Sequence, residues 1–393
     1  MLHHGQIKQD NKNQYFKRMK RVLYLMHVPW GWIKQRPHFF AEYLAKDCMV
    51  DVYYKQPIFV SNKGLLNSKE NKNNLVIKGF RQIPFDKIPL IKHLNLNWIN
   101  NIMLYKQLPN FEKYDYVWFT CPSMYQLFAH RLKSSNVVVY DCMDDILEFP
   151  FCKSNIFFAE KMLIAEKNLI LKSSKIFCSS DYLKNKILKR ANCNKKVVIV
   201  NNAIEPPAPN AVFKKLPNNV YSILNILEQH IHSLLYIGTI SQWFDFTLII
   251  EELNTYKDLH LILIGPSDVQ IPAHPHIHYL GTVERNYIFL LMKRAWCLIM
   301  PFQVNELIRS VNPVKLYEYI YMGKHVIAPK YGETIKFADY INLYDSENDF
   351  TTILKQIYSI KELDRQRQEK MKLFAESNTW ENRYQIIRKE LNI

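Results

Sequence analysis

Lys315 and Glu318 stand three residues apart in an apolar, helix-like segment, and this pair is the strongest chemical signal in the sequence. The spacing places the ammonium and the carboxylate on one face of a helix. Pro313 suits the first turn of that helix and Gly323 its end, so unpaired N–H groups are expected where the helix begins. A cation, a carboxylate and free N–H groups favour a ligand with both phosphates and hydroxyls, such as a nucleotide sugar. The alternative is an ordinary amphipathic helix.

Arg309 precedes this helix and is predicted to share a diphosphate with Lys315. Fixed cations stabilise the charge that grows on a nucleoside diphosphate leaving group, and they do so without a metal ion. Asn312 and Val314 flank the proline and complete the predicted donor-binding stretch.

Three acids follow one another closely at the end of the apolar run that begins at Val137, namely Asp141, Asp144 and Asp145. Because neighbouring carboxylates repel one another, at least one carboxyl pKa is predicted to rise toward neutral. Such a carboxylate can take the proton from an acceptor hydroxyl. Asp144 is the preferred base and Asp141 the second choice. Helix capping by solvated acids is the alternative.

Trp30, Trp32, Gln35 and Arg36 follow the first predicted strand. Aromatic rings bind the apolar faces of sugars, and glutamine and arginine bind hydroxyls or phosphate. The carboxyl end of a parallel strand is also where α/β sheets hold ligands. These four residues are therefore predicted to line the acceptor side, unless Pro37 simply starts a helix and the tryptophans belong to the core.

Glycine is scarce, with nine in 393 residues, yet Gly238, Gly265 and Gly281 each directly follow a predicted strand. This placement indicates tight turns or a close approach of the backbone to a ligand, although turn geometry alone is an alternative. Thr239 and Trp243 lie in the first of these turns. Exposed N–H groups there suit phosphate oxygens, and the indole can stack on a base or sugar or simply pack.

Short apolar runs alternate with helical patterns in both halves of the chain, which predicts α/β domains with parallel sheets. Residues 55–112, rich in lysine and asparagine, follow neither pattern. Residues 203–217 contain four prolines and predict a semi-rigid linker. Strands are predicted at Arg21–Val28, Met49–Tyr54, Asp115–Thr120, Val137–Asp141, Lys175–Ser179, Val197–Asn201, Ser233–Ile237, His260–Ile264, Ile277–Leu280, Cys297–Met300, Val326–Ala328 and Ile341–Leu343.

The net charge of +16 is concentrated in one half. Residues 1–200 contain 32 Lys+Arg and 15 Asp+Glu, a balance of +17, whereas residues 201–393 contain 20 and 21, a balance of −1. A basic half indicates an anionic partner, either a membrane surface or nucleic acid, unless the lysines are simply solvated. Because no nucleic-acid-binding motif occurs, a membrane surface is predicted and nucleic acid is not.

Seven scattered cysteines without a C-x-x-C motif indicate a reduced, cytoplasmic protein. No run of about 18 uncharged apolar residues and no secretory signal is found, so the predicted location is the cytoplasm, at the inner face of the plasma membrane. His274, His276 and His278 alternate as metal ligands can, but no acidic or cysteine partner is nearby. No metal site is predicted.

The segments at 30–38, 238–245 and 312–329 together resemble GT-B glycosyltransferases of the family-4-like kind, in particular the teichuronic-acid biosynthesis subgroup. The resemblance implies two Rossmann-like domains facing across a cleft, with the donor diphosphate and sugar over the Gly238 turn and the nucleobase near Gly265. It implies that Glu318 holds the ribose and that no metal ion or other cofactor is required. Many relatives carry a first glutamate where this sequence has Ser310, a departure for which Glu306 or Arg309 is the proposed substitute.

The resemblance also fixes the expected domain organisation. The predicted divisions are a flexible N-terminus at 1–18, an acceptor-binding Rossmann-like domain at 19–204, a linker at 205–217, a nucleotide-sugar-binding Rossmann-like domain at 218–376 and a helix at 377–393 that braces the N-terminal domain.

The sequence therefore predicts a transferase that moves a sugar from a UDP-sugar to a saccharide, expected to be lipid-linked, in bacterial surface polysaccharide synthesis such as that of capsule or lipopolysaccharide. Three alternatives stay open. A GT-B nucleotide-sugar 2-epimerase would need no acceptor, a non-catalytic GT-B module would bind UDP without turnover, and a nucleic-acid binder would show steeply salt-dependent binding.

Overall fold

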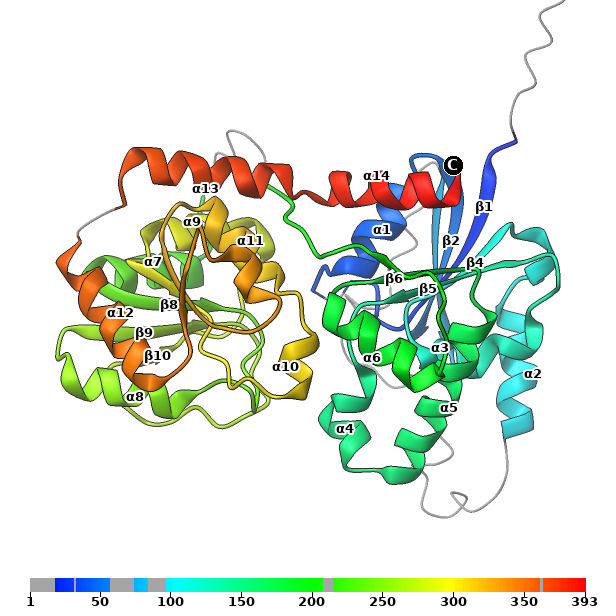
Figure 1. Cartoon of the computed structure of the whole chain (residues 1–393), viewed down its shortest axis with the longest axis horizontal. Coiled ribbons are helices and arrows are strands. Elements are labelled where there is room, and N and C mark those ends of the chain that lie inside the picture. Colours follow the sequence, from blue (N-terminus) through cyan, green and yellow to red (C-terminus); the bar gives the residue numbers. More distant parts are fainter. Residues whose placement is uncertain (1–17, 32, 57–73, 84–96, 208–214, 361–362) are drawn as a thin grey trace, which may run out of the picture.

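The computed structural model describes residues 18–31, 33–56, 74–83, 97–207, 215–360 and 363–393, which form two α/β domains side by side (Figure 1). Within these ranges, each domain is built on a single sheet in which every neighbouring pair of strands is parallel. Helices cover the sheets, as expected where parallel strands are joined by crossover helices.

The N-terminal sheet has the strand order β3-β2-β1-β4-β5-β6-β7 in the described part of the chain. Its strands are β1 (Lys20–Met26), β2 (Cys48–Gln56), β3 (Leu75–Arg81), β4 (Tyr116–Phe119), β5 (Val137–Cys142), β6 (Lys175–Cys178) and β7 (Val198–Ile199). Its helices are α1 (Arg36–Leu44), α2 (Asn97–Gln107), α3 (Pro122–Phe128), α4 (Pro150–Lys153), α5 (Ile156–Lys172) and α6 (Asp181–Ala191), with the short turns η3 (Phe111–Lys113), η4 (Ala129–Arg131) and η5 (Ile146–Glu148).

The C-terminal sheet has the order β10-β9-β8-β11-β12-β13 in the same described ranges. Its strands are β8 (His232–Ile237), β9 (Leu259–Ile264), β10 (Ile277–Tyr279), β11 (Cys297–Ile299), β12 (His325–Pro329) and β13 (Asn342–Tyr344). The helices of this half are α7 (Asn218–Gln229), α8 (Phe246–Thr255), α9 (Arg285–Arg294), α10 (Glu306–Ser310), α11 (Val314–Tyr321), α12 (Glu347–Ser359), α13 (Arg365–Ser377) and α14 (Trp380–Leu391), with η6 (Thr334–Phe337).

Alternation along β1 builds the two faces of the N-terminal core. Val22 and Tyr24 pack into one apolar cluster, whereas Leu23 and Leu25 pack into another. Successive side chains of a strand point to opposite faces, so a sheet covered on both sides needs apolar residues at every position. This requirement explains the continuous apolar runs that identified the strands in the sequence.

In both sheets the strand order reverses beside the first strand of the domain, at β1–β4 and at β8–β11. Open α/β sheets hold their ligands at such reversals, outside the carboxyl ends of the strands. Trp30 follows β1 and Gly238 follows β8, so the two segments singled out in the sequence emerge at these positions.

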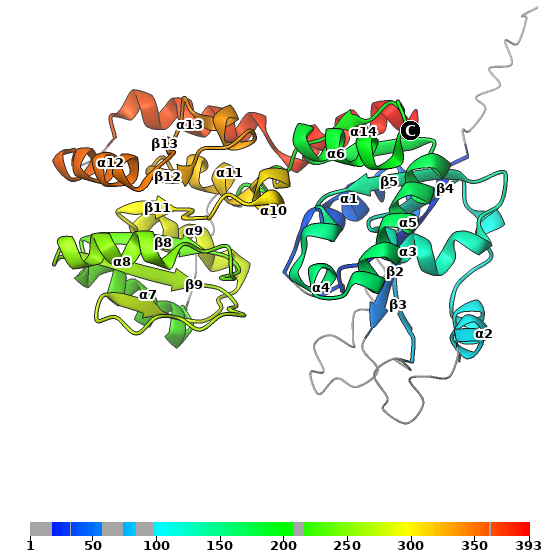
Figure 2. The same cartoon turned by 60° about the horizontal axis from the view of Figure 1, so that its bottom comes forward.

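The two final helices run from one domain to the other. Figure 1 shows α13 along the C-terminal domain and α14 continuing along the N-terminal domain, and Figure 2 shows the same path from another side. Trp380 stacks on Phe39 of α1 with ring centroids 4.6 Å apart, and the Tyr116 hydroxyl donates to the carbonyl of Leu391 at 2.6 Å. The start of the linker contacts the junction between α13 and α14, since the amide of Ile204 donates to the carbonyl of Asn378 at 3.0 Å.

The region 55–112, which the sequence left unassigned, contains β3 and α2 in its described part. Strand β3 extends the parallel sheet at its edge, with Leu75 opposite Val50. Of the other predicted segments, residues 1–17, Trp32 and residues 208–214 of the linker lie outside the described residues.

Trp380→Ala is expected to destabilise the protein by about 3–5 kcal/mol, because it empties a fully buried site between α14 and α1. Urea-induced unfolding followed by circular dichroism measures the loss. The control is Leu373→Ala on α13, an exposed apolar residue of the same pair of helices, which should change stability by less than about 0.5 kcal/mol. Equal losses in the two variants would show that α14 does not brace the first domain.

Candidate active site

Helix α11 delivers Lys315 to the turn that follows β8. A Cβ built on Gly238 would lie 2.2 Å from the Lys315 Cε and 2.7 Å from its Nζ, so a larger residue here would displace the end of the lysine side chain. Gly238 also has φ +148°, a conformation that side-chain-bearing residues rarely adopt. The predicted cation and the predicted phosphate turn, far apart in the sequence, are therefore in contact.

Gly265 completes this close packing. A Cβ on Gly265 would lie 2.1 Å from the carbonyl oxygen of Gly238, and the Gly238 amide donates to the carbonyl of Ile264 at 2.8 Å. The turns after β8 and β9 thus lie against one another. Gly281 belongs to the same layer, because its carbonyl accepts from the amide of Gly265 at 2.7 Å.

Lys315 is half-buried and, among the described residues, it forms no ion pair and no hydrogen bond. Its Nζ lies 5.2 Å from the ring centroid of Tyr236 and 5.6 Å from that of Phe302. Burial lowers the pKa of Lys315 to about 8, an effect that the nearby Glu318 partly offsets. An ammonium held in this way lacks a compensating anion, which a ligand phosphate would supply.

Glu318 is 7% exposed and already has a cationic partner that the sequence did not indicate. The Arg285 guanidinium donates to Glu318 Oε1 at 2.8 Å, and its Nε lies 3.7 Å from the Glu205 carboxylate of the linker. Arg285 starts α9, far from α11 in the sequence, so no local pattern connects the two residues. The described contacts of Glu318 use Oε1 and leave Oε2 for a ligand.

Asn312 and Val314 lie at a joint between the domains. The Asn312 Oδ1 accepts from the amide of Asn202 at 2.8 Å, and its Nδ2 donates to Glu333 Oε2 at 2.8 Å. Val314 packs against an apolar cluster of the N-terminal domain. Pro313 is the N-cap residue of α11. These positions fix the start of the helix, and the Asn312 side chain is fully used in doing so.

Thr239 and Trp243 lie in the turn between β8 and α8. The carbonyl of Thr239 accepts from the Tyr236 hydroxyl at 2.6 Å, and the half-buried Trp243 ring lies 6.4 Å from the ring of Phe302. The turn ends at Asp245, whose Oδ1 accepts from the amide of Leu248 at 3.2 Å and caps α8. Asp245 thus has a local structural role.

In the N-terminal domain, Arg36 and Asp141 form a buried ion pair, with exposures of 1% and 0%. Arg36 Nη2 lies 2.7 Å from Asp141 Oδ1, its Nε donates at 2.9 Å, and Nη1 donates to the carbonyl of Val200. The pair fixes the end of β5 against the start of α1. Asp141 is thus committed to Arg36, and neither side chain faces solvent.

Asp144 differs from its two neighbours, because this half-buried residue has no side-chain hydrogen bond or ion pair among the described residues. Asp145 instead accepts from both Arg190 nitrogens at 2.7 Å. Burial raises the pKa of Asp144 to about 6; Arg36 opposes this shift, while Asp145 and Asp141 add to it. A free carboxylate with a pKa of about 6 is suited to general base catalysis.

The aromatic segment after β1 is largely packed. Trp30 is buried, with its ring centroid 5.1 Å from that of His38. Gln35 precedes α1, and its backbone amide donates to His38 Nδ1 at 3.1 Å. Trp32 lies outside the described residues. Trp30 therefore contributes to the core beside the site, in line with the alternative weighed from the sequence.

Comparison with solved structures gives a match over nearly the whole chain. Sucrose-phosphate synthase from Thermosynechococcus elongatus matches with a TM-score of 0.70 and 12% identity, covering 95% of this chain and 99% of that one. The crystal structure of Anabaena HepE in complex with UDP and glucose matches with a TM-score of 0.64 and 13% identity over the same shares. The chain has the GT-B fold.

The sequence also has a curated relative, named Putative teichuronic acid biosynthesis glycosyltransferase TuaH, from Bacillus subtilis (strain 168). The two are 29% identical over 232 residues, which is 56% of each chain, so the match spans little more than half of the relative's length. No family model matches the chain. The resemblance to the teichuronic-acid subgroup is confirmed, together with the GT-B fold class.

The α10 loop of this GT-B chain lies against the N-terminal domain. The buried Ser310, at the position where the resemblance implied a glutamate, accepts at its carbonyl from Ser180 Oγ at 2.7 Å. Glu306 accepts from the Tyr182 hydroxyl at 2.8 Å and from Lys186 at 3.0 Å. Arg309 is exposed on the same helix. Of the two proposed substitutes, Glu306 is thus engaged between the domains, whereas Arg309 faces solvent.

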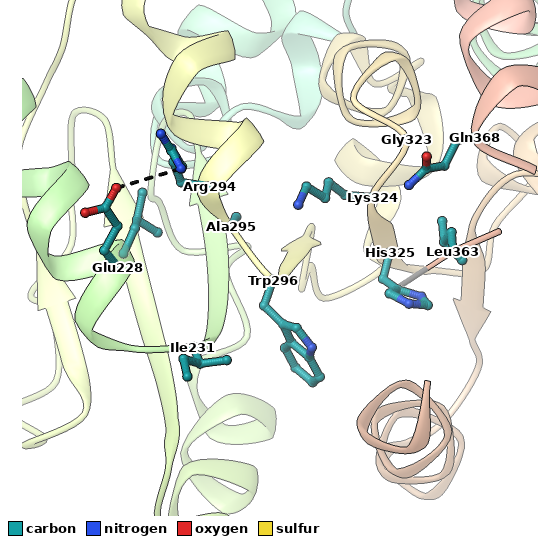
Figure 3. A pocket seen from close by; sticks show the side chains of 11 residues that line it. Glu228, Ile231, Arg294, Ala295, Trp296, Gly323, Lys324, His325, Leu363 and Gln368 are labelled. Carbon is teal, nitrogen blue, oxygen red and sulfur yellow. Dashed lines mark ion pairs between the residues drawn. The ribbon is translucent and has the colours of Figure 1, made fainter. Parts of the chain in front are cut away.

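A pocket of about 330 Å³ lies elsewhere in the C-terminal domain (Figure 3). Trp296 and His325 line it at the start of β11 and β12, and a weak ion pair between Glu228 and Arg294 lies on one side. Parallel sheets hold ligands at the opposite, carboxyl ends of the strands. We therefore do not assign the GT-B donor to this pocket.

Proposed function

We propose that this protein is a glycosyltransferase that moves a sugar from a UDP-sugar to a saccharide acceptor without a catalytic metal ion. The observation that carries the proposal is Lys315, a half-buried ammonium without a described anionic partner, placed against the Gly238 turn at the strand-order reversal of the C-terminal sheet. Support for UDP comes from HepE, which has the same fold and was crystallised with UDP and with UDP-glucose.

In the proposed reaction Asp144 takes the proton of an acceptor hydroxyl while that oxygen forms a bond to the anomeric carbon of the donor. The bond from this carbon to the β-phosphate oxygen breaks, and UDP departs with the electron pair. Lys315 and the exposed Arg309 stabilise the charge that grows on the diphosphate. Glu318 Oε2 accepts from a ribose hydroxyl. Direct attack of this kind inverts the configuration at the anomeric carbon.

Lys315→Ala is expected to weaken UDP binding by at least about tenfold, because a charge-assisted contact to the diphosphate is lost. Isothermal titration calorimetry measures the affinity. For the wild type, affinity should fall as the pH rises through about 8, where Lys315 loses its proton, and this fall should be absent in the variant.

The control is Lys330→Ala, which removes an exposed lysine paired with Asp345 in the same domain and should leave UDP affinity unchanged. Unchanged affinity in Lys315→Ala would exclude Lys315 from the donor site. UDP binding with neither transfer nor hydrolysis of UDP-sugars would identify a non-catalytic GT-B module. Inversion at C2 of a UDP-sugar without acceptor would identify an epimerase.

Asp144→Asn should lower turnover by about 10²–10⁴-fold and leave UDP affinity near that of the wild type, because the proposed base acts on the acceptor and not on the donor. The rate of the wild type should fall as the pH drops below about 6, where Asp144 becomes protonated. Release of UDP in a coupled assay measures both. Glu160→Gln, an exposed acid on α5, is the matched control. Full activity of Asp144→Asn would end its assignment as base.

We further propose that the acceptor is lipid-linked and that the enzyme binds the inner face of the bacterial plasma membrane during surface polysaccharide synthesis. None of the helices in the described part of the chain has the length and apolarity that a bilayer crossing needs. Support for surface binding comes from the excess of 17 positive charges in residues 1–200. Support for a role in polysaccharide synthesis comes from the similarity to TuaH, whose name refers to teichuronic acid biosynthesis.

Exposed apolar side chains locate the proposed membrane contact. Phe151 on α4 and Ile156 and Phe157 at the start of α5 are exposed, Phe157 at 75%. In Figure 1 these helices form the lower edge of the N-terminal domain. Lys153 and Lys161 stand among them. Only the short turn η5 separates Asp144 from α4 in the sequence. In this proposal, an acceptor lipid held at this edge therefore lies close to the base.

The double variant Ile156→Ser/Phe157→Ser should lower partitioning onto vesicles that contain anionic lipid by at least about tenfold, since it removes the apolar side chains that enter the bilayer interface. Vesicle co-sedimentation measures the effect, and added salt should weaken wild-type binding. Ile335→Ser, an exposed apolar residue of the C-terminal domain, serves as the control. Unaltered, salt-insensitive partitioning would contradict this docking surface.

A further inference from the structure

Four histidines lie together at the edge of the C-terminal sheet. The sequence alone had pointed only to His274, His276 and His278, which are close neighbours along the chain. A ring nitrogen from each of His230, His260 and His278 lies within 4.8 Å of the other two. His260 Nδ1 and His278 Nε2 are 3.1 Å apart, and the rings of His230 and His260 stack at 3.6 Å. His276 lies beside them, its ring centroid 4.5 Å from that of His260.

Strand register explains why these side chains converge. Strand β10 pairs with β9 so that Ile277 lies opposite Leu261 and His278 opposite Ile262. Because opposed residues and every second residue share a face of a sheet, His260 and His278 lie on the same face. His230 is the C-cap residue of α7 and approaches this face from the helix end. Three separate elements thus supply one imidazole each.

We propose that His230, His260 and His278 bind one divalent transition metal ion, with zinc as the best match. Zinc sites with three histidines have Zn–N distances of about 2.0–2.1 Å, which in a tetrahedron places the nitrogens about 3.3 Å apart. The 3.1 Å separation of His260 and His278 is close to this value, and the His230 nitrogen, within 4.8 Å of both, would move closer by rotation of its side chain. Imidazole ligands also suit nickel, cobalt and copper, so selectivity among these ions is for the experiment to determine.

The surroundings of the cluster favour the ligand form of its histidines. Burial and the neighbouring histidines lower the pKa of His260 to about 4, and the pKa values of His230 and His278 are also lowered, so all three are neutral near pH 7. Neutral imidazole is the species that binds a metal. His276 Nδ1 is buried without a hydrogen-bond partner in the described structure, which offers a fourth ligand after rotation of its ring.

The position of the cluster distinguishes its role from that of the candidate active site. His260 is the second residue of β9 and His230 precedes β8, whereas Gly265 and Gly238 follow the other ends of these strands. A metal ion here would clamp the edge strand β10 and the end of α7 to the sheet. Its expected effect is on the stability of the domain, and sugar transfer need not involve it.

The test uses full-length, tag-free protein and zinc chloride alone. Zinc should bind with a stoichiometry of one per chain in a competition with a chromophoric chelator, and it should raise the midpoint of thermal unfolding. Cobalt in place of zinc should give the strong visible bands of a tetrahedral site. His260→Gln and His278→Gln should each weaken zinc binding by at least about tenfold and abolish the thermal stabilisation.

Two controls address adventitious binding. His130→Gln, an exposed histidine of the N-terminal domain, should bind zinc as the wild type does, and so should the variant His3→Gln/His4→Gln. No zinc binding by the wild type, or full binding by both cluster variants, would overturn the proposal. If a cluster variant fails to fold, a protection experiment on the wild-type protein tests the proposal instead. Zinc should then protect His230, His260 and His278 from diethyl pyrocarbonate, as measured by mass spectrometry, and modification of all three despite zinc would refute the site.

Discussion

The contact between Lys315 and the Gly238 turn is the constraint on which the candidate site depends. A methyl group at Gly238 would occupy the space of the lysine side chain, and a methyl group at Gly265 would collide with the Gly238 carbonyl. Glycine at 265 therefore lets the two turns pack against one another, and glycine at 238 leaves the space in which the Lys315 side chain lies. Such an arrangement stabilises the folded protein little, since Lys315 has lost water without a described anion in return. A ligand phosphate beside Lys315 would supply the missing negative charge.

Charge compensation also distinguishes the three acids at the carboxyl end of β5, namely Asp141, Asp144 and Asp145. Asp141 and Asp145 are buried and each has an arginine, so their negative charges are compensated inside the protein. Asp144 lies between them without a described partner, and its raised pKa follows from burial and from the two neighbouring carboxylates. Among the described residues, Lys315 in the C-terminal domain and Asp144 in the N-terminal domain thus have no ion-pair partner, whereas Asp141 and Asp145 are paired inside the protein.

Much of the fold could be predicted from the sequence because parallel strands buried on both faces leave continuous apolar runs. The predicted strand at Val137–Asp141 is found at Val137–Cys142, and that at Cys297–Met300 at Cys297–Ile299. Helix α2 was missed because it is rich in asparagine and its apolar periodicity is weak. Strand β3 was missed because its short apolar run at the sheet edge is followed at once by Lys78 and Gly79. The contacts that position the site residues are formed by residues far apart in the sequence. Nothing in the sequence links Arg285 to Glu318, Asn202 to Asn312, or His230 to His278, since each pair meets only after the sheet has formed.

Helix α11 connects the site to the joint between the domains. Its start is fixed by Asn312, which bridges Asn202 of the N-terminal domain and Glu333 of the C-terminal domain, and its first turn carries Lys315. Helices are stiff over two turns, so the position of the ammonium relative to the Gly238 turn depends on the contact between the domains. Glu333 strengthens this dependence, because its other oxygen accepts from the amide of Asp181 at the start of α6, at 3.2 Å. A ligand that draws Lys315 toward its phosphates therefore acts on the same helix that sets how the two domains meet. In the proposed reaction, binding of the donor at Lys315 and the approach of the domain that carries Asp144 would therefore be linked through this one short helix.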